Sequence, residues 1–112
     1  MTTINTAKLE QAVTVLEAAV ACQEHLVWWL DLTYDMGLAQ EGYRSDVFEE
    51  GHELGMARRW LERLRHVSTV QSAQIFLGEL EDARSVTGAR DYGLMQGAYE
   101  LVQQAVDGEG AG

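Results

Sequence analysis

Apolar side chains recur every three or four residues along a segment from about Thr6 to Met36, and this spacing predicts one long amphipathic helix. The chain contains no proline, so no residue of that kind interrupts the segment. Beside the main apolar set runs a parallel set, which comprises Ala12, Val15, Ala19, Cys22, Leu26 and Trp29. Together the two sets form a face wide enough to pack against two neighbouring helices. We therefore expect Cys22 to be buried and Trp29 to point inward with Leu26.

Three further helices are predicted, and no window shows the alternation of a strand. Thr6 is the predicted N-cap of the first helix, and a capping box at 68–71 implies a very tight turn before the third. Gly93 and Gly97 lie four apart in the fourth helix, where small residues allow another helix to approach closely. The expected bounds are a loop at 37–45, a second helix from Ser45 or Asp46 to about His66, a third ending at Gly88, and a fourth from about Arg90 to Val106.

The sequence thus predicts an all-α fold: a four-helix, bundle-like single domain over residues 1–112, with a long first helix and a loosely held tail at about 107–112. It carries 18 acidic and 8 basic side chains, a formal net charge of −10 at pH 7. Direct binding to nucleic acid or to an anionic membrane is disfavoured, because both are polyanions, and a basic protein surface is favoured. With no signal region, no long apolar run and one cysteine, we expect a cytoplasmic protein.

Acidic side chains recur every seven residues along the first helix, at Glu10, Glu17, Glu24 and Asp31. This acidic row places its carboxylates about 10.5 Å apart on one flank. Trp28 belongs to the same flank, because it lies four residues after Glu24 and three before Asp31. An outward tryptophan among carboxylates is typical of a binding hot spot. The predicted contact set, here called the acidic flank, is Glu17, Glu24, Trp28, Asp31 and Asp35. The alternative is a solvated helix face with Trp28 covered by the loop at 37–45.

Half of the basic residues lie in one short segment, 58–66, as Arg58, Arg59, Arg63 and Arg65. Arginines at the end of a helix complement its dipole, and Arg58 has the spacing for an ordinary ion pair with Glu62. The other interpretation is that this arginine cluster binds the acidic flank of a second copy of the chain and forms a homodimer.

Carboxylates and a histidine gather at the start of the second helix, where Glu49 and Glu53 fall on the predicted core side and His52 lies between them. Glu49-x-x-His52 has the ligand spacing of di-iron helical bundles. The segment from Glu49 to Trp60 resembles the metal-binding helix of encapsulated ferritins. That resemblance implies an iron-oxidising, oligomeric protein with Glu49, His52 and Glu53 as ligands. The alternative needs no cofactor: acidic residues favour a helix N-terminus and can project into water.

No phosphate-binding glycine loop or nucleophile motif is present, so we expect a binding protein rather than an enzyme. In its size, strong negative charge and single helical domain, the chain resembles the anti-CRISPR proteins, phage-encoded inhibitors of bacterial defence. The resemblance implies a partner such as a CRISPR effector, whose basic surface for guide or target nucleic acid the acidic flank would occupy. Carboxylates would then pair with arginines and lysines that otherwise neutralise phosphates.

Overall fold

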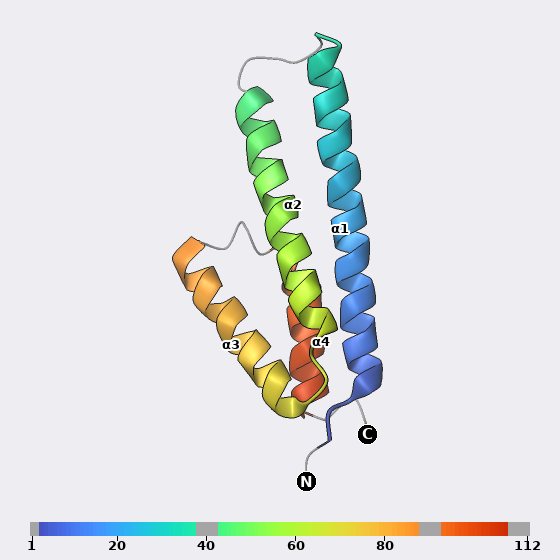
Figure 1. Cartoon of the computed structure of the whole chain (residues 1–112), viewed down its shortest axis with the longest axis vertical. Helices are drawn as coiled ribbons and strands as arrows, with labels where there is room; N and C mark the ends of the chain where they lie inside the picture. The colour runs from blue at the N-terminus through green and yellow to red at the C-terminus, as the bar shows by residue number, and fades with distance from the viewer. Residues whose placement is uncertain (1–2, 38–42, 88–92, 108–112) are drawn as a thin grey trace.

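The computed structural model describes residues 3–37, 43–87 and 93–107 and places four α-helices within them. These are α1 (Thr6–Asp35), α2 (Tyr43–Arg65), α3 (Val70–Thr87) and α4 (Gln96–Asp107). The molecule measures 59 × 26 × 20 Å, because α1 and α2 form a long antiparallel hairpin along its length (Figure 1). The predicted all-helical, bundle-like fold with a long first helix is confirmed.

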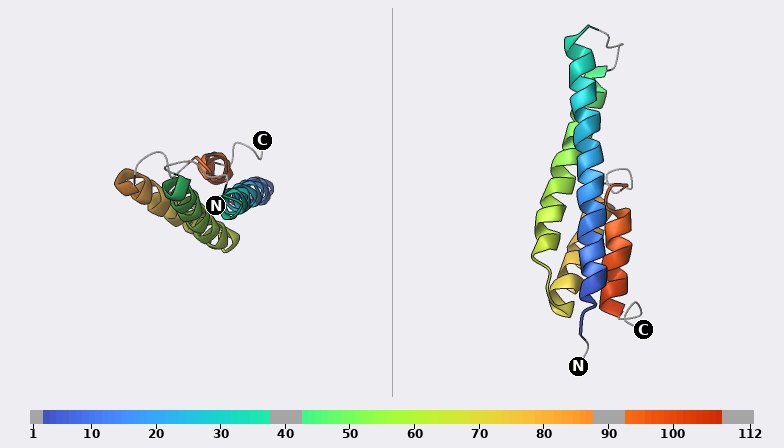
Figure 2. Two further views of the ribbon diagram at one scale, coloured as in Figure 1. Left: turned by 90° about the horizontal axis from the view of Figure 1, so that it is seen from above. Right: turned by 90° about the vertical axis from the view of Figure 1, so that its right-hand side faces the viewer.

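Helices α3 and α4 flank only one half of the α1–α2 hairpin, at the end where residue 3 lies (Figures 1 and 2). We call this the proximal end, and the end where α1 finishes and α2 starts the distal end. Helix α4 packs on α1 and α3. The hairpin is thus covered by further helices near its proximal end and projects beyond them at its distal end.

Two contacts fix how α4 lies on α1. The main-chain N–H of Asn5 donates a hydrogen bond to the carbonyl oxygen of Ala105, at 3.1 Å. At the other end of α4, a Cβ placed on Gly97 would lie 3.1 Å from Val15 Cγ1, so the two helices approach closely there, as predicted for that glycine. Helix α4 therefore runs antiparallel to α1 and covers it from Asn5 to about Val15.

The hydrophobic core lies in the proximal half. Its buried members come from every helix: Leu9, Ala12, Leu16, Val20, Leu54, Ala57, Trp60, Leu61, Leu64, Ala73, Phe76, Leu80, Ala98, Val102 and Ala105. Trp60 of α2 meets Phe76 of α3 edge to face, with ring centroids 5.7 Å apart. Within the described part of α1, Val20 is the last buried apolar side chain, and only the polar Gln23 is buried after it.

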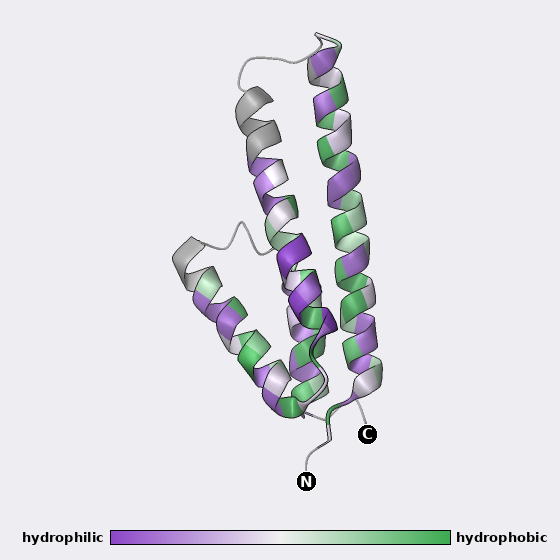
Figure 3. Ribbon diagram, viewed as in Figure 1, coloured by the Kyte–Doolittle hydropathy of each residue, from purple (hydrophilic) through white to green (hydrophobic). Residues whose placement is uncertain are grey.

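Three residues that were predicted to be inward are exposed instead. Cys22 is exposed, Leu26 is 38% exposed and Trp29 is 51% exposed. These predictions were wrong because they assumed a second neighbouring helix along the whole of α1, whereas α4 lies beside α1 only in its proximal half (Figure 2). Apolar residues, green in Figure 3, therefore continue along α1 beyond the part that α4 covers.

The first helix and the third are each capped one residue away from the predicted position. Asn5, rather than Thr6, caps α1, since its Oδ1 accepts a hydrogen bond from the Lys8 N–H at 3.3 Å. At the start of α3, Thr69 Oγ1 accepts from the Ser72 N–H at 3.0 Å, and Ser72 Oγ accepts from the Thr69 N–H at 2.9 Å. This reciprocal pair is a capping box built on Thr69 and Ser72.

The remaining boundaries differ modestly from prediction. Helix α2 begins at Tyr43, so Ser45 and Asp46 lie inside its first turns rather than before it. The tight turn predicted between α2 and α3 is present at residues 66–69. Helix α4 begins at Gln96, later than predicted. The predicted stop at Gly88, the start at Arg90 and the tail at 108–112 lie outside the described residues.

Candidate protein-binding surface

All four carboxylates of the acidic row are exposed along α1. Two members of the acidic flank have partners on α2. The guanidinium of Arg65 lies 3.3 Å from Glu17 Oε2, and that of Arg58 lies 3.4 Å from Glu24 Oε1. All four side chains are about half exposed, and each such pair contributes roughly 0–1 kcal/mol to stability. The pairs still neutralise the two carboxylates locally.

Two arginines of the cluster, Arg58 and Arg65, therefore pair with the acidic flank of their own chain. The predicted Arg58–Glu62 pair is replaced by Arg58–Glu24, while Glu62 interacts with Arg65 at 3.6 Å and with the imidazole of His66 at 3.3 Å. Arg63 pairs with Glu79 of α3 at 2.6 Å and lies over the Trp60 ring, 4.8 Å from its centroid. These arginines connect α2 to its two neighbours.

Near the distal end, the carboxylates of the acidic flank have no partners in the described chain. Asp31 and Asp35 are exposed, and in the part of the chain that the structure describes neither carboxylate makes a hydrogen bond or an ion pair. Their carboxylates face water. The acidic flank is thus divided into a paired half, with Glu17 and Glu24, and an unpaired half.

Trp28 lies in the unpaired half and is 56% exposed, which agrees with the outward position predicted for it. Its ring stacks on the imidazole of His25, with centroids 5.6 Å apart and 30° between the planes. This contact restricts the rotamers of Trp28 before any partner binds, so less conformational entropy is lost on association. An exposed, partly ordered indole beside Asp31 and Asp35 has the composition of an interface anchor with a charged rim.

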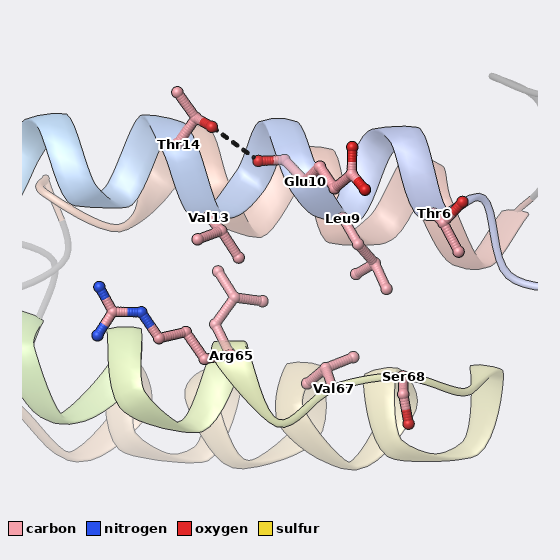
Figure 4. A pocket seen from close by; sticks show the side chains of 9 residues that line it. Thr6, Leu9, Glu10, Val13, Thr14, Arg65, Val67 and Ser68 are labelled. Carbon is pink, nitrogen blue, oxygen red and sulfur yellow. Dashed lines mark hydrogen bonds between the residues drawn. The ribbon is translucent and has the colours of Figure 1, made fainter.

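A shallow groove of about 500 Å³ lies between the start of α1 and the end of α2 (Figure 4). Leu9, Val13 and Val67 line it with apolar surface, and Glu10 and Arg65 lie at its sides. No buried charged or polar side chain points into this groove among the residues that line it. It offers apolar contact without the polar groups that orient a small ligand.

The alternative metal site is not assembled within the described residues. Glu49 and His52 are exposed and Glu53 is half-buried. In the described ranges no three histidine, cysteine, aspartate or glutamate side chains lie close enough together to hold a metal ion. Glu49 and Glu53 each take part in a polar or electrostatic interaction.

Sequence reasoning missed Glu50 as a structural residue. Gln23, only 6% exposed, donates from Nε2 to the main-chain oxygen of Glu50 at 3.0 Å and to its Oε2 at 2.5 Å. Gln23 is the one polar residue in the main apolar set of the first helix, and this break is the signal that could have indicated a buried hydrogen bond. The bond joins α1 to α2 at the point where the apolar core ends.

The described helices include none that is both long and apolar enough to cross a lipid bilayer. Comparisons with protein-family models, with curated proteins and with solved structures find no match to this chain. The function proposed below is therefore argued from the surface itself.

Proposed function

We propose that this protein binds a basic protein surface, with Trp28, Asp31 and Asp35 as the primary contact and Glu17 and Glu24 as secondary contacts. The observation that carries this proposal is the exposed Trp28, held by His25 beside two carboxylates that have no partner in the described chain. A net charge of −10 adds long-range attraction to a basic partner.

The two kinds of group have different roles in such a contact. Carboxylates at the rim raise the rate of encounter and select against acidic partners. The indole supplies apolar area at the centre, where truncation of a hot-spot residue costs about 2 kcal/mol or more. Because an indole also accepts a guanidinium on its face, a surface rich in arginine fits both parts of the site.

The paired half of the acidic flank can contact the partner only if its carboxylates exchange their internal ion pairs for new ones. Glu17 and Glu24 would leave Arg65 and Arg58 and pair with basic groups of the partner, at little cost because both internal pairs are half exposed. A basic protein surface that otherwise binds the phosphates of nucleic acid is a fitting target. The CRISPR effector implied by the anti-CRISPR resemblance is one candidate for a partner with such a surface.

The experiment is affinity capture from a bacterial lysate with three tagged proteins: the wild type, Trp28→Ala and Trp29→Ala. The expected result is one basic protein or nucleoprotein that the wild type and Trp29→Ala recover and Trp28→Ala does not. Recovery should fall steeply when the salt concentration is raised, because the rim contacts are ionic.

Trp29 is the matched control, since it is the same residue type, next in the sequence and similarly exposed. Equal recovery of the same proteins by both variants would show that Trp28 is not the anchor. If recovery did not depend on the salt concentration, the carboxylates would not be contact residues.

A further inference from the structure

The parallel apolar set of α1 extends into a regular seam. Its members alternate at spacings of four and three, the pattern by which coiled-coil helices bury a contact line: Val15, Ala19, Cys22, Leu26, Trp29, Thr33 and Met36. We call these residues the neutral seam.

The first part of the neutral seam contacts other parts of the chain but is not fully covered by them. Val15 meets α4 at Gly97 and is still 40% exposed, and Ala19 is half-buried against the core. The rest continues in the same line beyond the end of α4, with nothing over it among the described elements: Cys22 is exposed, and Leu26, Trp29 and Met36 are 38%, 51% and 61% exposed. Figure 2 shows α4 beside α1 only in its proximal half. The seam is thus an internal helix–helix interface that extends further than its internal partner.

The charge pattern around the neutral seam indicates what kind of surface covers the exposed part of the seam beyond α4. The positions that flank it carry no aspartate, glutamate, lysine or arginine: Ala18, Gln23, His25, Leu30 and Leu32. The acidic row falls at the heptad position farthest from the seam, on the opposite side of the helix. In a chain with a net charge of −10, this is the side of α1 on which two copies can meet without opposing carboxylates.

We propose that the distal parts of two α1 helices pack against each other through the neutral seam and form an antiparallel homodimer. A parallel arrangement is excluded, because it would place the proximal half of the second α1 in the space that α4 fills. In the antiparallel register that pairs Cys22 of each copy with Thr33 of the other, Leu26 of each copy faces Trp29 of the other. The large indole then lies against a residue of moderate size rather than against itself.

This dimer is a different surface from the one proposed for the basic partner. It leaves both copies of Trp28, Asp31 and Asp35 on the outside, since they lie on the far side of α1. It also differs from a homodimer in which the arginine cluster binds a second copy, because Arg58 and Arg65 already pair within the chain.

The test is sedimentation equilibrium of the full chain over a wide concentration range, for the wild type, Trp29→Glu and Trp28→Glu. We expect the wild type to approach twice its 12.5 kDa chain mass. Trp29→Glu should raise the dissociation constant of the dimer by about 30-fold or more, as for a hot-spot residue, and Trp28→Glu should leave it within a few-fold. Both tryptophans are about half exposed, so neither variant disturbs the core.

Any of three results would overturn the proposal: a 12.5 kDa mass for the wild type at every concentration, a dimer that Trp29→Glu does not weaken, or equal weakening by Trp28→Glu. The thiol of Cys22 gives a second readout that needs no substitution. Its rate of alkylation by a maleimide should fall as the protein concentration rises, because the dimer covers it. A rate independent of concentration under conditions where the protein is dimeric would place the interface elsewhere.

Discussion

Trp28 and Trp29 are adjacent in α1, are 56% and 51% exposed, and face surfaces of opposite character. Neighbouring residues of a helix point about 100° apart, so the two indoles lie on different sides of it. Trp28 stacks on His25 beside unpaired carboxylates, whereas Trp29 lies in the neutral seam. The distal half of the hairpin therefore presents two separate apolar anchors, and each tryptophan is the natural control for the other.

The double substitution Asp31→Lys with Asp35→Lys should weaken binding to the basic partner by at least about tenfold, mainly through a slower association rate. The melting temperature should stay nearly constant, because neither carboxylate has a partner in the described chain. Surface plasmon resonance at two salt concentrations measures the first effect, and thermal denaturation followed by circular dichroism measures the second.

Glu10→Lys is a suitable control for that double substitution. It changes the charge of a residue in the same acidic row but near the other end of α1, and it should leave the affinity close to that of the wild type. If Glu10→Lys weakened binding as much per charge as the aspartate substitutions, the partner would be responding to net charge rather than to the distal surface.

Arg58→Gln should increase the association rate for a basic partner, because it removes the internal partner of Glu24 and leaves that carboxylate available. The free energy of unfolding should change by no more than about 1 kcal/mol, since the Arg58–Glu24 pair is half exposed. Stopped-flow association at low salt is the measurement.

Arg59→Gln provides the matched comparison for Arg58→Gln. It makes the same change in net charge one residue further along α2, and in the described chain Arg59 has no ion pair to lose. Equal acceleration by the two substitutions would mean that release of Glu24 contributes nothing.

Much of the fold could be predicted from the spacing of apolar residues, because that spacing determines which side of each helix becomes buried. It indicated the apolar face of α1, and the 100° separation of adjacent residues indicated that Trp28 points outward. The same pattern gives the width of an apolar face but not the length of the helix that will cover it. For that reason Cys22, Leu26 and Trp29 were assigned to a core that ends before them.

The ion pairs of the candidate site could not be predicted for a related reason. Whether Arg58 meets Glu62 or Glu24 depends on how far α2 is displaced along α1, and sequence spacing within one helix carries no information on that displacement. The displacement is fixed by the packed core and by the Gln23–Glu50 hydrogen bond, which forms only once both helices are in place.

Gln23→Ala should lower the free energy of unfolding by about 1–3 kcal/mol, because Gln23 is buried and its amide supplies hydrogen bonds to Glu50. Loss of the amide leaves the half-buried Glu50 carboxylate without this donor. Urea denaturation measures the change, and Gln11→Ala, at an exposed position of the same helix, should stay within about 0.5 kcal/mol of the wild type. Similar losses in both variants would show that the Gln23–Glu50 bond contributes little.

Glycines inside the helices should respond to alanine according to the space around them. Nothing lies within 4 Å of a Cβ placed on Gly51, Gly55 or Gly78, so alanine at each should stabilise the protein by up to about 1 kcal/mol through its higher helix propensity. Thermal or urea denaturation of the three single variants checks this. A loss of stability at any of them would contradict the open space around that glycine.

Gly97→Ala should behave differently from those three, because its new methyl group would lie 3.1 Å from Val15 Cγ1 in the α1–α4 contact. The gain in helix propensity is then offset by displacement of Val15, and the net change in the free energy of unfolding should be near zero or unfavourable. Shortening Val15 to alanine removes the opposing methyl group. Gly97→Ala should therefore be more favourable in a Val15→Ala background than in the wild type, a coupling that a double-mutant cycle measures. Additive effects would show that α4 does not approach α1 through this pair.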